Sequence, residues 1–192
     1  VAGGTWSSSN TLVATVGSTG VVTGVTAGNP TISYTLPAGC FVLFPMTVNT
    51  TPPANTGTAV VCTGLTTTLA NGTGGGTWTS SNTGEATVVA GTGVVTGVAA
   101  GFPTITYTVP SGCFVTTNLT VNISPASIAG ASSVCVGANT TLTNSSGGGA
   151  WTSSNTILAT VGAGTGVVTG VAAGSPTITY TLPNACFSVQ PM

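Results

Sequence analysis

The sequence predicts an all-β protein built from tandem β-sandwich repeats of about 73 residues. The first observation is the repetition, because a Gly-Gly-x-Trp-x-Ser-Ser-Asn block returns around Trp6, Trp78 and Trp151. The second is composition, since Val, Ile, Thr and Tyr dominate and Gly or Pro interrupts them about every 8–12 residues. The third is an alternation of apolar and hydroxyl residues, which is typical of a strand with one buried face.

The second repeat shows the expected elements most clearly. A Gly-rich turn separates its first two strands, and a Gly-Thr-Gly turn joins the next two into a hairpin. Residues 103–109 alternate strictly, so Ile105 and Tyr107 are expected to face the core while Thr104, Thr106 and Thr108 face outward. The expected strands cover 66–71, 77–81, 86–90, 93–98, 103–109 and 113–123.

About seven short strands in about 73 residues is the size of an immunoglobulin-like sandwich. The period divides the chain into three repeats. Residues 1–51 form a partial repeat that lacks its first strands, residues 52–124 form a whole repeat, and residues 125–192 form a repeat that lacks the end of its last strand.

Each repeat carries one Trp and one Tyr that are expected to anchor its core. A Trp beside a Gly-rich turn could instead stack on a sugar ring, but sandwich domains commonly bury a Trp. We expect each Tyr to be buried with its hydroxyl reaching the backbone of a loop. The predicted anchors are Trp6, Trp78, Trp151, Tyr34, Tyr107 and Tyr180.

The composition excludes several classes of function. The chain contains no Lys, Arg or His, and Glu85 is its one charged side chain. Binding to nucleic acid needs cations that displace counterions from phosphate, and metal sites need clusters of His, thiolate or carboxylate, which only reduced cysteines could supply here. General acid–base and Ser-His-Asp catalysis lack their proton carriers, so we expect no enzyme activity and no cofactor.

The near-absence of charge favours self-association. Soluble proteins carry about 25% charged residues, whereas this chain carries 1%. No long-range repulsion keeps copies apart, although Thr, Ser and Asn side chains could also solvate a dispersed stalk. Glu85 has no cation to pair with, so we expect it outside the core, together with the aligned Val13 and Leu158.

Neither a membrane span nor a signal peptide is expected. The longest apolar run covers only residues 40–46, while a spanning helix needs about 20 residues. The first residues lack a basic and an apolar region. Because the chain begins in mid-repeat, we expect it to be a mature or partial segment.

The order of these motifs resembles the bacterial immunoglobulin-like repeats of group 2. The resemblance rests on the Trp-Ser-Ser-Asn block, then Ala-Thr-Val, Gly-Val-Val-Thr-Gly-Val and Thr-Ile-Thr-Tyr-Thr, and it covers the whole chain. The early Val-Cys-x-Gly and the late Cys are similar to disulfide-bearing repeats of giant extracellular proteins. The resemblance implies a β-sandwich and an extracellular or cell-surface setting, but no particular ligand.

We predict one disulfide within each of the second and third repeats, Cys62–Cys113 and Cys135–Cys186. Both pairs are 51 residues apart, and both place an early cysteine opposite the start of the last strand. Free buried thiols are the alternative, while disulfides would indicate an oxidising compartment. Cys40 has no partner within the chain, because the first repeat lacks the matching cysteine.

The first repeat lacks the counterpart of the strands within 52–71. It should therefore expose apolar core and an unpaired sheet edge, which invites a strand from elsewhere. Either a longer parent chain or a neighbouring copy of the same repeat would supply that strand.

Two functions remain open at this point. One is a structural segment of a surface fibre, filament or stalk that associates with copies of itself. The other is an adhesin module that recognises glycan, ice or a host receptor through loops or Thr-rich faces. Repetition without a divergent segment favours the structural role. The hydroxyl rows concerned are Thr31, Ser33 and Thr35; Thr104, Thr106 and Thr108; and Thr177, Thr179 and Thr181.

Overall fold

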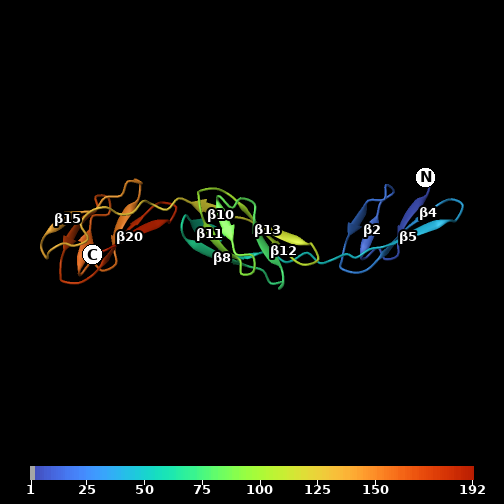
Figure 1. The fold of residues 1–192 in the computed structure, drawn as a ribbon, viewed down its shortest axis with the longest axis horizontal. Helices are drawn as coiled ribbons and strands as arrows, with labels where there is room; N and C mark the ends of the chain where they lie inside the picture. Colours follow the sequence, from blue (N-terminus) through green and yellow to red (C-terminus); the bar gives the residue numbers. More distant parts are fainter. Residues whose placement is uncertain (1–2) are drawn as a thin grey trace. The chain divides into compact units, whose positions relative to one another are not determined.

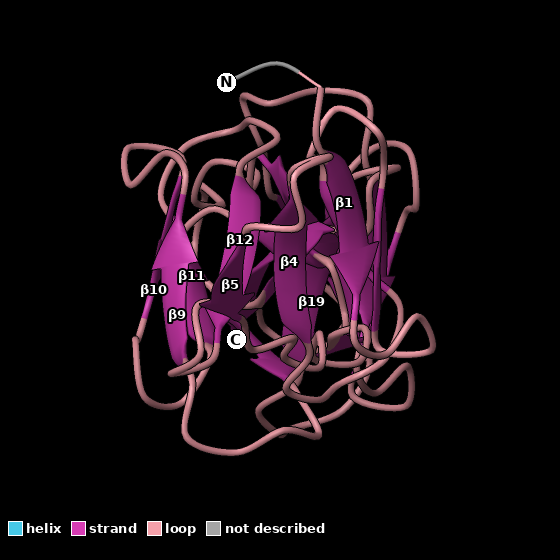
Figure 2. Ribbon diagram, turned by 90° about the vertical axis from the view of Figure 1, so that its right-hand side faces the viewer, coloured by secondary structure: helices cyan, strands magenta, loops and turns pink. Residues whose placement is uncertain are grey.

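The computed structural model describes residues 3–192, and this range contains strands, turns and loops but no helix (Figures 1 and 2). The prediction of an all-β fold is confirmed. The strands are short because Gly and Pro interrupt each run of β-formers. In chain order they are β1 (Thr5–Ser8), β2 (Ala14–Val16), β3 (Val22–Gly24), β4 (Thr31–Thr35), β5 (Phe41–Pro45), β6 (Thr56–Gly57), β7 (Val60–Cys62), β8 (Thr66–Ala70), β9 (Thr77–Ser80), β10 (Ala86–Val88), β11 (Val94–Gly97), β12 (Thr104–Thr108), β13 (Phe114–Asn118), β14 (Thr120–Asn122), β15 (Asn139–Thr141), β16 (Ala150–Ser153), β17 (Ala159–Val161), β18 (Val167–Gly170), β19 (Thr177–Thr181) and β20 (Phe187–Pro191).

Each repeat divides its strands between sheets. In the first repeat, β1, β4 and β5 form one sheet, and β2 pairs with β3. In the second, the sheet orders are β10-β11-β8-β6 and β13-β12-β9, while β7 and β14 pair in parallel. In the third, they are β15-β18-β17 and β16-β19-β20.

The alternation predicted for the central strands is observed. In β12, Ile105 and Tyr107 are buried and the three threonines that alternate with them are half-buried, and β19 repeats this pattern. The core of the third repeat gathers buried residues from β16, β17, β18 and β19 and two residues outside the strands, as expected when two inner faces meet. Its buried members are Ile128, Leu142, Trp151, Ala159, Val168, Ile178 and Tyr180.

The last strand of the second repeat differs from the prediction. The sequence indicates one strand over 113–123, but the structure divides it into β13 and β14 at Leu119. The Leu119 side chain is fully buried and its N–H donates to the Pro103 carbonyl at 2.9 Å, whereas the Thr120 N–H donates to Ala59 at 2.9 Å. The chain therefore leaves the sheet of β12 after Leu119 and pairs with β7.

The chain forms two compact units. One contains the described residues up to Asn55, together with Asn71–Thr77 and Tyr107–Thr116. The other contains Thr56–Ala70, Trp78–Thr106 and Thr117–Met192, so it holds the third repeat and most of the second. The division into repeats at 51/52 and 124/125 remains a prediction from the sequence period.

Candidate functional site: a junction disulfide and an open groove

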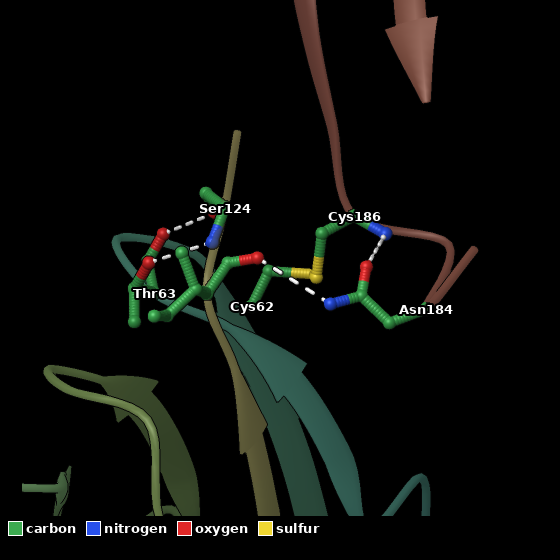
Figure 3. The surroundings of a disulfide bond; sticks show 6 residues. Cys62, Thr63, Ser124, Asn184 and Cys186 are labelled. Carbon is green, nitrogen blue, oxygen red and sulfur yellow. Dashed lines mark hydrogen bonds between the residues drawn. A yellow bond between two sulfur atoms is a disulfide. The ribbon is translucent and has the colours of Figure 1, made fainter. Parts of the chain in front are cut away.

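A disulfide joins Cys62 of the second repeat to Cys186 of the third (Figure 3). Both cysteines lie in the same compact unit. Their Cα atoms are 5.8 Å apart and the two residues are separated by 124 positions in the sequence. The Cys186 side chain is completely buried.

Although Cys62 comes early in the second repeat along the sequence, it lies in space beside the last residues of that repeat, where the chain continues into the third. It is the last residue of β7, which runs parallel to β14 and places Cys62 opposite Asn122. The next residue, Thr63, holds the chain that leaves β14. The Ser124 N–H donates to Thr63 Oγ1 at 2.9 Å, and Ser124 Oγ donates to the Thr63 carbonyl at 2.7 Å.

Cys186 lies in the tight loop between β19 and β20. The Leu182 N–H donates to the Cys186 carbonyl at 2.8 Å, and Asn184 Oδ1 accepts from the Cys186 N–H at 3.0 Å. Asn184 Nδ2 donates at 3.5 Å to the carbonyl of Ile123, which belongs to the second repeat (Figure 3). The loop therefore contacts the junction through both a hydrogen bond and the disulfide.

The predicted pairs, Cys62–Cys113 and Cys135–Cys186, are not those of the structure. In the third repeat Cys186 precedes β20, whereas Val134, the neighbour of Cys135, lines a groove with Met192 at the far end of β20. A five-residue strand spans roughly 17 Å, whereas bonded cysteines have Cα atoms about 4.4–6.8 Å apart. The early and late cysteines lie at opposite ends of a repeat, so a bond forms between successive repeats.

The remaining cysteines of the described chain are free. Cys40 and Cys135 are exposed, and Cys113 is half-buried. Cys113 is the counterpart of Cys186, and Cys135 is the counterpart of Cys62.

The structure places the Trp and Tyr residues of the second and third repeats in the core. Trp78 and Trp151 are 5% and 6% exposed, and Tyr107 and Tyr180 are buried. Each Tyr hydroxyl accepts a backbone N–H from the Gly-rich turn before the Trp strand. The pairs are Gly4 to Tyr34 at 2.9 Å, Gly76 to Tyr107 at 2.9 Å and Gly149 to Tyr180 at 2.8 Å.

Trp6 departs from the predicted burial. Its side chain is 37% exposed, and Tyr34 is half-buried. The local pairing is unchanged, because the Trp6 and Tyr34 ring centroids are 4.7 Å apart, the same distance as in the Trp151–Tyr180 pair. Trp6 is exposed because no strand covers it in the described part of the first repeat.

This exposed core forms an apolar groove of about 480 Å³. Val42 and Phe44 lie opposite Tyr34 and Ile32 in the β4–β5 pair, so they point to the same side as the core residues. The groove is lined by Trp6, Val22, Ile32, Val42, Phe44 and Met46, among others.

Two further sets of side chains lie outside the core. Glu85 and its counterparts Val13 and Leu158 are all half-buried, and Glu85 lies over Gly101. The hydroxyl rows lie on the central strands β4, β12 and β19, where all of their members are half-buried between two neighbouring strands.

Residues 3–192 contain no group of three or more His, Cys, Asp or Glu side chains that could hold a metal ion. Within the same range, no helix has the length and apolar character needed to cross a membrane.

Comparison with known proteins gives one family match. The model of the bacterial Ig-like domain (group 2) matches residues 3–41 and 114–190, which is more than half of the chain. A search of curated proteins found no match.

Several solved structures are similar at low identity. Domains 4 and 5 of the S-layer protein SbsC are 26% identical over 64% of this chain and 70% of that chain, with a TM-score of 0.28. The C-terminal 282-residue fragment of intimin, in complex with the intimin-binding domain of its translocated receptor, is 16% identical over 85% of this chain and 57% of that chain, with a TM-score of 0.33. Mouse cadherin-23 EC22–24 is 10% identical over 98% and 84%, with a TM-score of 0.32.

Proposed function

Because the chain belongs to the bacterial Ig-like domain family (group 2), we propose that it is a structural segment of an extracellular surface fibre, filament or stalk. The observation that carries this proposal is the Cys62–Cys186 bond, which joins consecutive repeats in addition to the backbone. A bond at this place does not shape a ligand site. It limits how far two neighbouring repeats can be pulled apart.

The bond provides a second path for tension. The backbone between Cys62 and Cys186 contains the rest of the second repeat and most of the third. When the chain is pulled from its ends, force passes through the disulfide and not through these residues. The repeats between the two cysteines can therefore lose their folded structure without lengthening the chain, which suits a segment that bears load.

The proposed location follows from the same bond. Disulfides persist in oxidising surroundings such as the cell exterior and are rare in reducing ones. A cell-surface or secreted setting agrees with the family and with the bond.

The surface supports association of copies through neutral contacts. Glu85 is the single charged side chain, and large apolar side chains are exposed along the chain, among them Leu12, Phe102 and Ile157. Contacts between such surfaces consist of apolar burial and uncharged hydrogen bonds, which salt does not screen. The proposed role needs no catalytic residue, which agrees with the lack of proton carriers in the composition.

Electron microscopy combined with sedimentation tests this proposal. The purified chain is expected to form rods or fibres that persist as salt is raised, and reduction is expected to make the rods more flexible. Specific binding on a glycan array, or inhibition of ice recrystallisation by dispersed single chains, would replace the structural role with the adhesin role. Dispersed chains without either activity would also contradict the proposed self-association.

A further inference from the structure

The loop that carries Cys186 differs from its two counterparts at the residue two positions before the cysteine. The three loops read Pro-Ala-Gly-Cys at 37–40, Pro-Ser-Gly-Cys at 110–113 and Pro-Asn-Ala-Cys at 183–186. Asn184 thus stands where the other loops have Ala or Ser. Its side-chain amide offers an acceptor oxygen and a separate donor nitrogen, so it can bond in two directions at once.

The oxygen of this amide orders the loop itself. Asn184 Oδ1 accepts from the Cys186 N–H at 3.0 Å, which closes a turn over Ala185. Ala185 has a φ of +66°, a conformation that is unfavourable for a residue with a Cβ. Glycines occupy the same position in the other two loops. The bond from Asn184 therefore holds the backbone of Cys186 in place although Ala replaces Gly.

The nitrogen of the same amide reaches the second repeat (Figure 3). Asn184 Nδ2 donates to the Ile123 carbonyl at 3.5 Å. Ile123 follows Asn122, the residue that lies opposite Cys62 in the parallel β7–β14 pair. Asn184 is exposed, so this contact is not part of a core. One side chain therefore connects the backbone of Cys186 to the end of the strand beside Cys62.

The position of Cys62 is fixed from within the second repeat. The Thr63 N–H donates to the Asn122 carbonyl at 2.8 Å, and Ser124 bonds both the hydroxyl and the carbonyl of Thr63. These bonds do not involve the third repeat. Asn184 brings the loop of the third repeat to this fixed end.

We propose that Asn184 is a positioning residue for the formation of the Cys62–Cys186 bond. It binds the Ile123 carbonyl before the sulfur atoms are joined, and it thereby raises the effective concentration of the Cys186 thiol at Cys62. The inference rests on the junction bond, as the proposed function does, and it adds the residue that directs this bond.

The reaction is an ordinary thiol–disulfide exchange. The two thiols lose their hydrogens as the S–S bond forms, and a small disulfide such as oxidised glutathione is reduced to two thiols. Asn184 takes no part in the exchange of electrons or protons. Its effect is confined to where the Cys186 loop lies when the thiolate attacks.

The redox equilibrium of the full 192-residue chain in glutathione buffer tests the proposal. The fraction of chains with the Cys62–Cys186 bond is measured by acid quenching and peptide mapping without reduction. The ratio of squared reduced glutathione to oxidised glutathione at half-formation gives the effective concentration of the two thiols. Asn184→Ala removes both side-chain hydrogen bonds and should lower this midpoint ratio at least about threefold.

Asn184→Asp separates positioning from the order of the loop. Aspartate keeps an oxygen that accepts the Cys186 N–H, but it replaces the donor nitrogen by an oxygen that faces the Ile123 carbonyl. This variant should therefore lower the midpoint ratio at least about threefold as well. Ser111→Ala, at the equivalent position of the loop at 110–113, is the matched control and should leave the ratio within about 1.5-fold. Circular dichroism of each reduced variant verifies that the fold is retained.

Two results would overturn the positioning role while the junction bond stands. These are an unchanged midpoint for Asn184→Asp, which would leave Asn184 with the order of its own loop alone, and an equal loss for Ser111→Ala. An unaltered chain that never forms the Cys62–Cys186 bond would refute the bond, the proposed function and this inference together. A bond that depends on Asn184 in chains that form no rods or fibres would support the inference and contradict the proposed function.

Discussion

Pulling a single chain from its two ends should reveal the Cys62–Cys186 bond directly. The perturbation is reduction of the disulfide in a force-extension experiment, with handles attached beyond residues 1 and 192. While the bond holds, the 124-residue separation contributes almost nothing to the stretched length. After reduction the whole chain can extend.

The expected gain follows from the structure. A fully extended residue spans at most about 3.6 Å, so releasing a separation of 124 residues adds roughly 450 Å. The oxidised chain leaves only about 70 residues free to stretch, or roughly 250 Å. The difference is far larger than the folded size of a repeat, which makes the two states easy to distinguish.

The alternative pairing of the cysteines would give a different force-extension curve. Bonds within the repeats, Cys62–Cys113 and Cys135–Cys186, would each hide 51 residues. Reduction of these two bonds would lengthen the stretched chain in two steps of roughly 180 Å each. Two such steps, or full extension without any reductant, would refute the junction bond. The Cys186→Ser variant is the control, since it should extend fully in oxidising buffer.

Three further predictions concern local stability and association. Ala185, in the loop before Cys186, has a φ of +66°, which is unfavourable for a residue with a Cβ. Ala185→Gly should therefore raise the free energy of unfolding by about 0.5–1 kcal/mol, measured by thermal melts. Gly112→Ala in the equivalent loop should lower it by about the same amount. Trp151→Ala should lower the free energy of unfolding by about 3–5 kcal/mol, measured by urea unfolding followed by circular dichroism. Trp6 is 37% exposed, so Trp6→Ala should lower it by only about 1 kcal/mol. Equal losses of stability would show that Trp6 is covered in solution. Assemblies should keep their sedimentation coefficient in about 1 M salt, where charges are screened beyond about 3 Å, and their dissociation would indicate a charged partner.

Local features of the fold could be predicted from the sequence. The strand β12, for example, was expected to bury Ile105 and Tyr107, and it does so because a period of two fixes which side chains share a face. The same reasoning placed Trp6 in a core, whereas its side chain is 37% exposed.

The disulfide could not be predicted, because spacing along the chain does not say at which end of a sandwich a residue lies. Cys62 and Cys113 have the same spacing as Cys135 and Cys186, and that regularity favoured pairs within a repeat. The deciding feature is the parallel pairing of β7 with β14, which carries Cys62 to the end of its repeat. The change of sheet at Leu119 escaped prediction for a related reason, since both halves of that run look like one continuous strand.

Peptide mapping without reduction tests most directly whether consecutive repeats are covalently joined. The chain is alkylated under non-reducing conditions, digested with a protease that cleaves at apolar or aromatic residues, and examined by mass spectrometry. We predict alkylated Cys40, Cys113 and Cys135, together with one cross-linked peptide pair that contains Cys62 and Cys186. Recovery of Cys62 linked to Cys113 and of Cys135 linked to Cys186 would contradict the junction bond and the load-bearing role built on it.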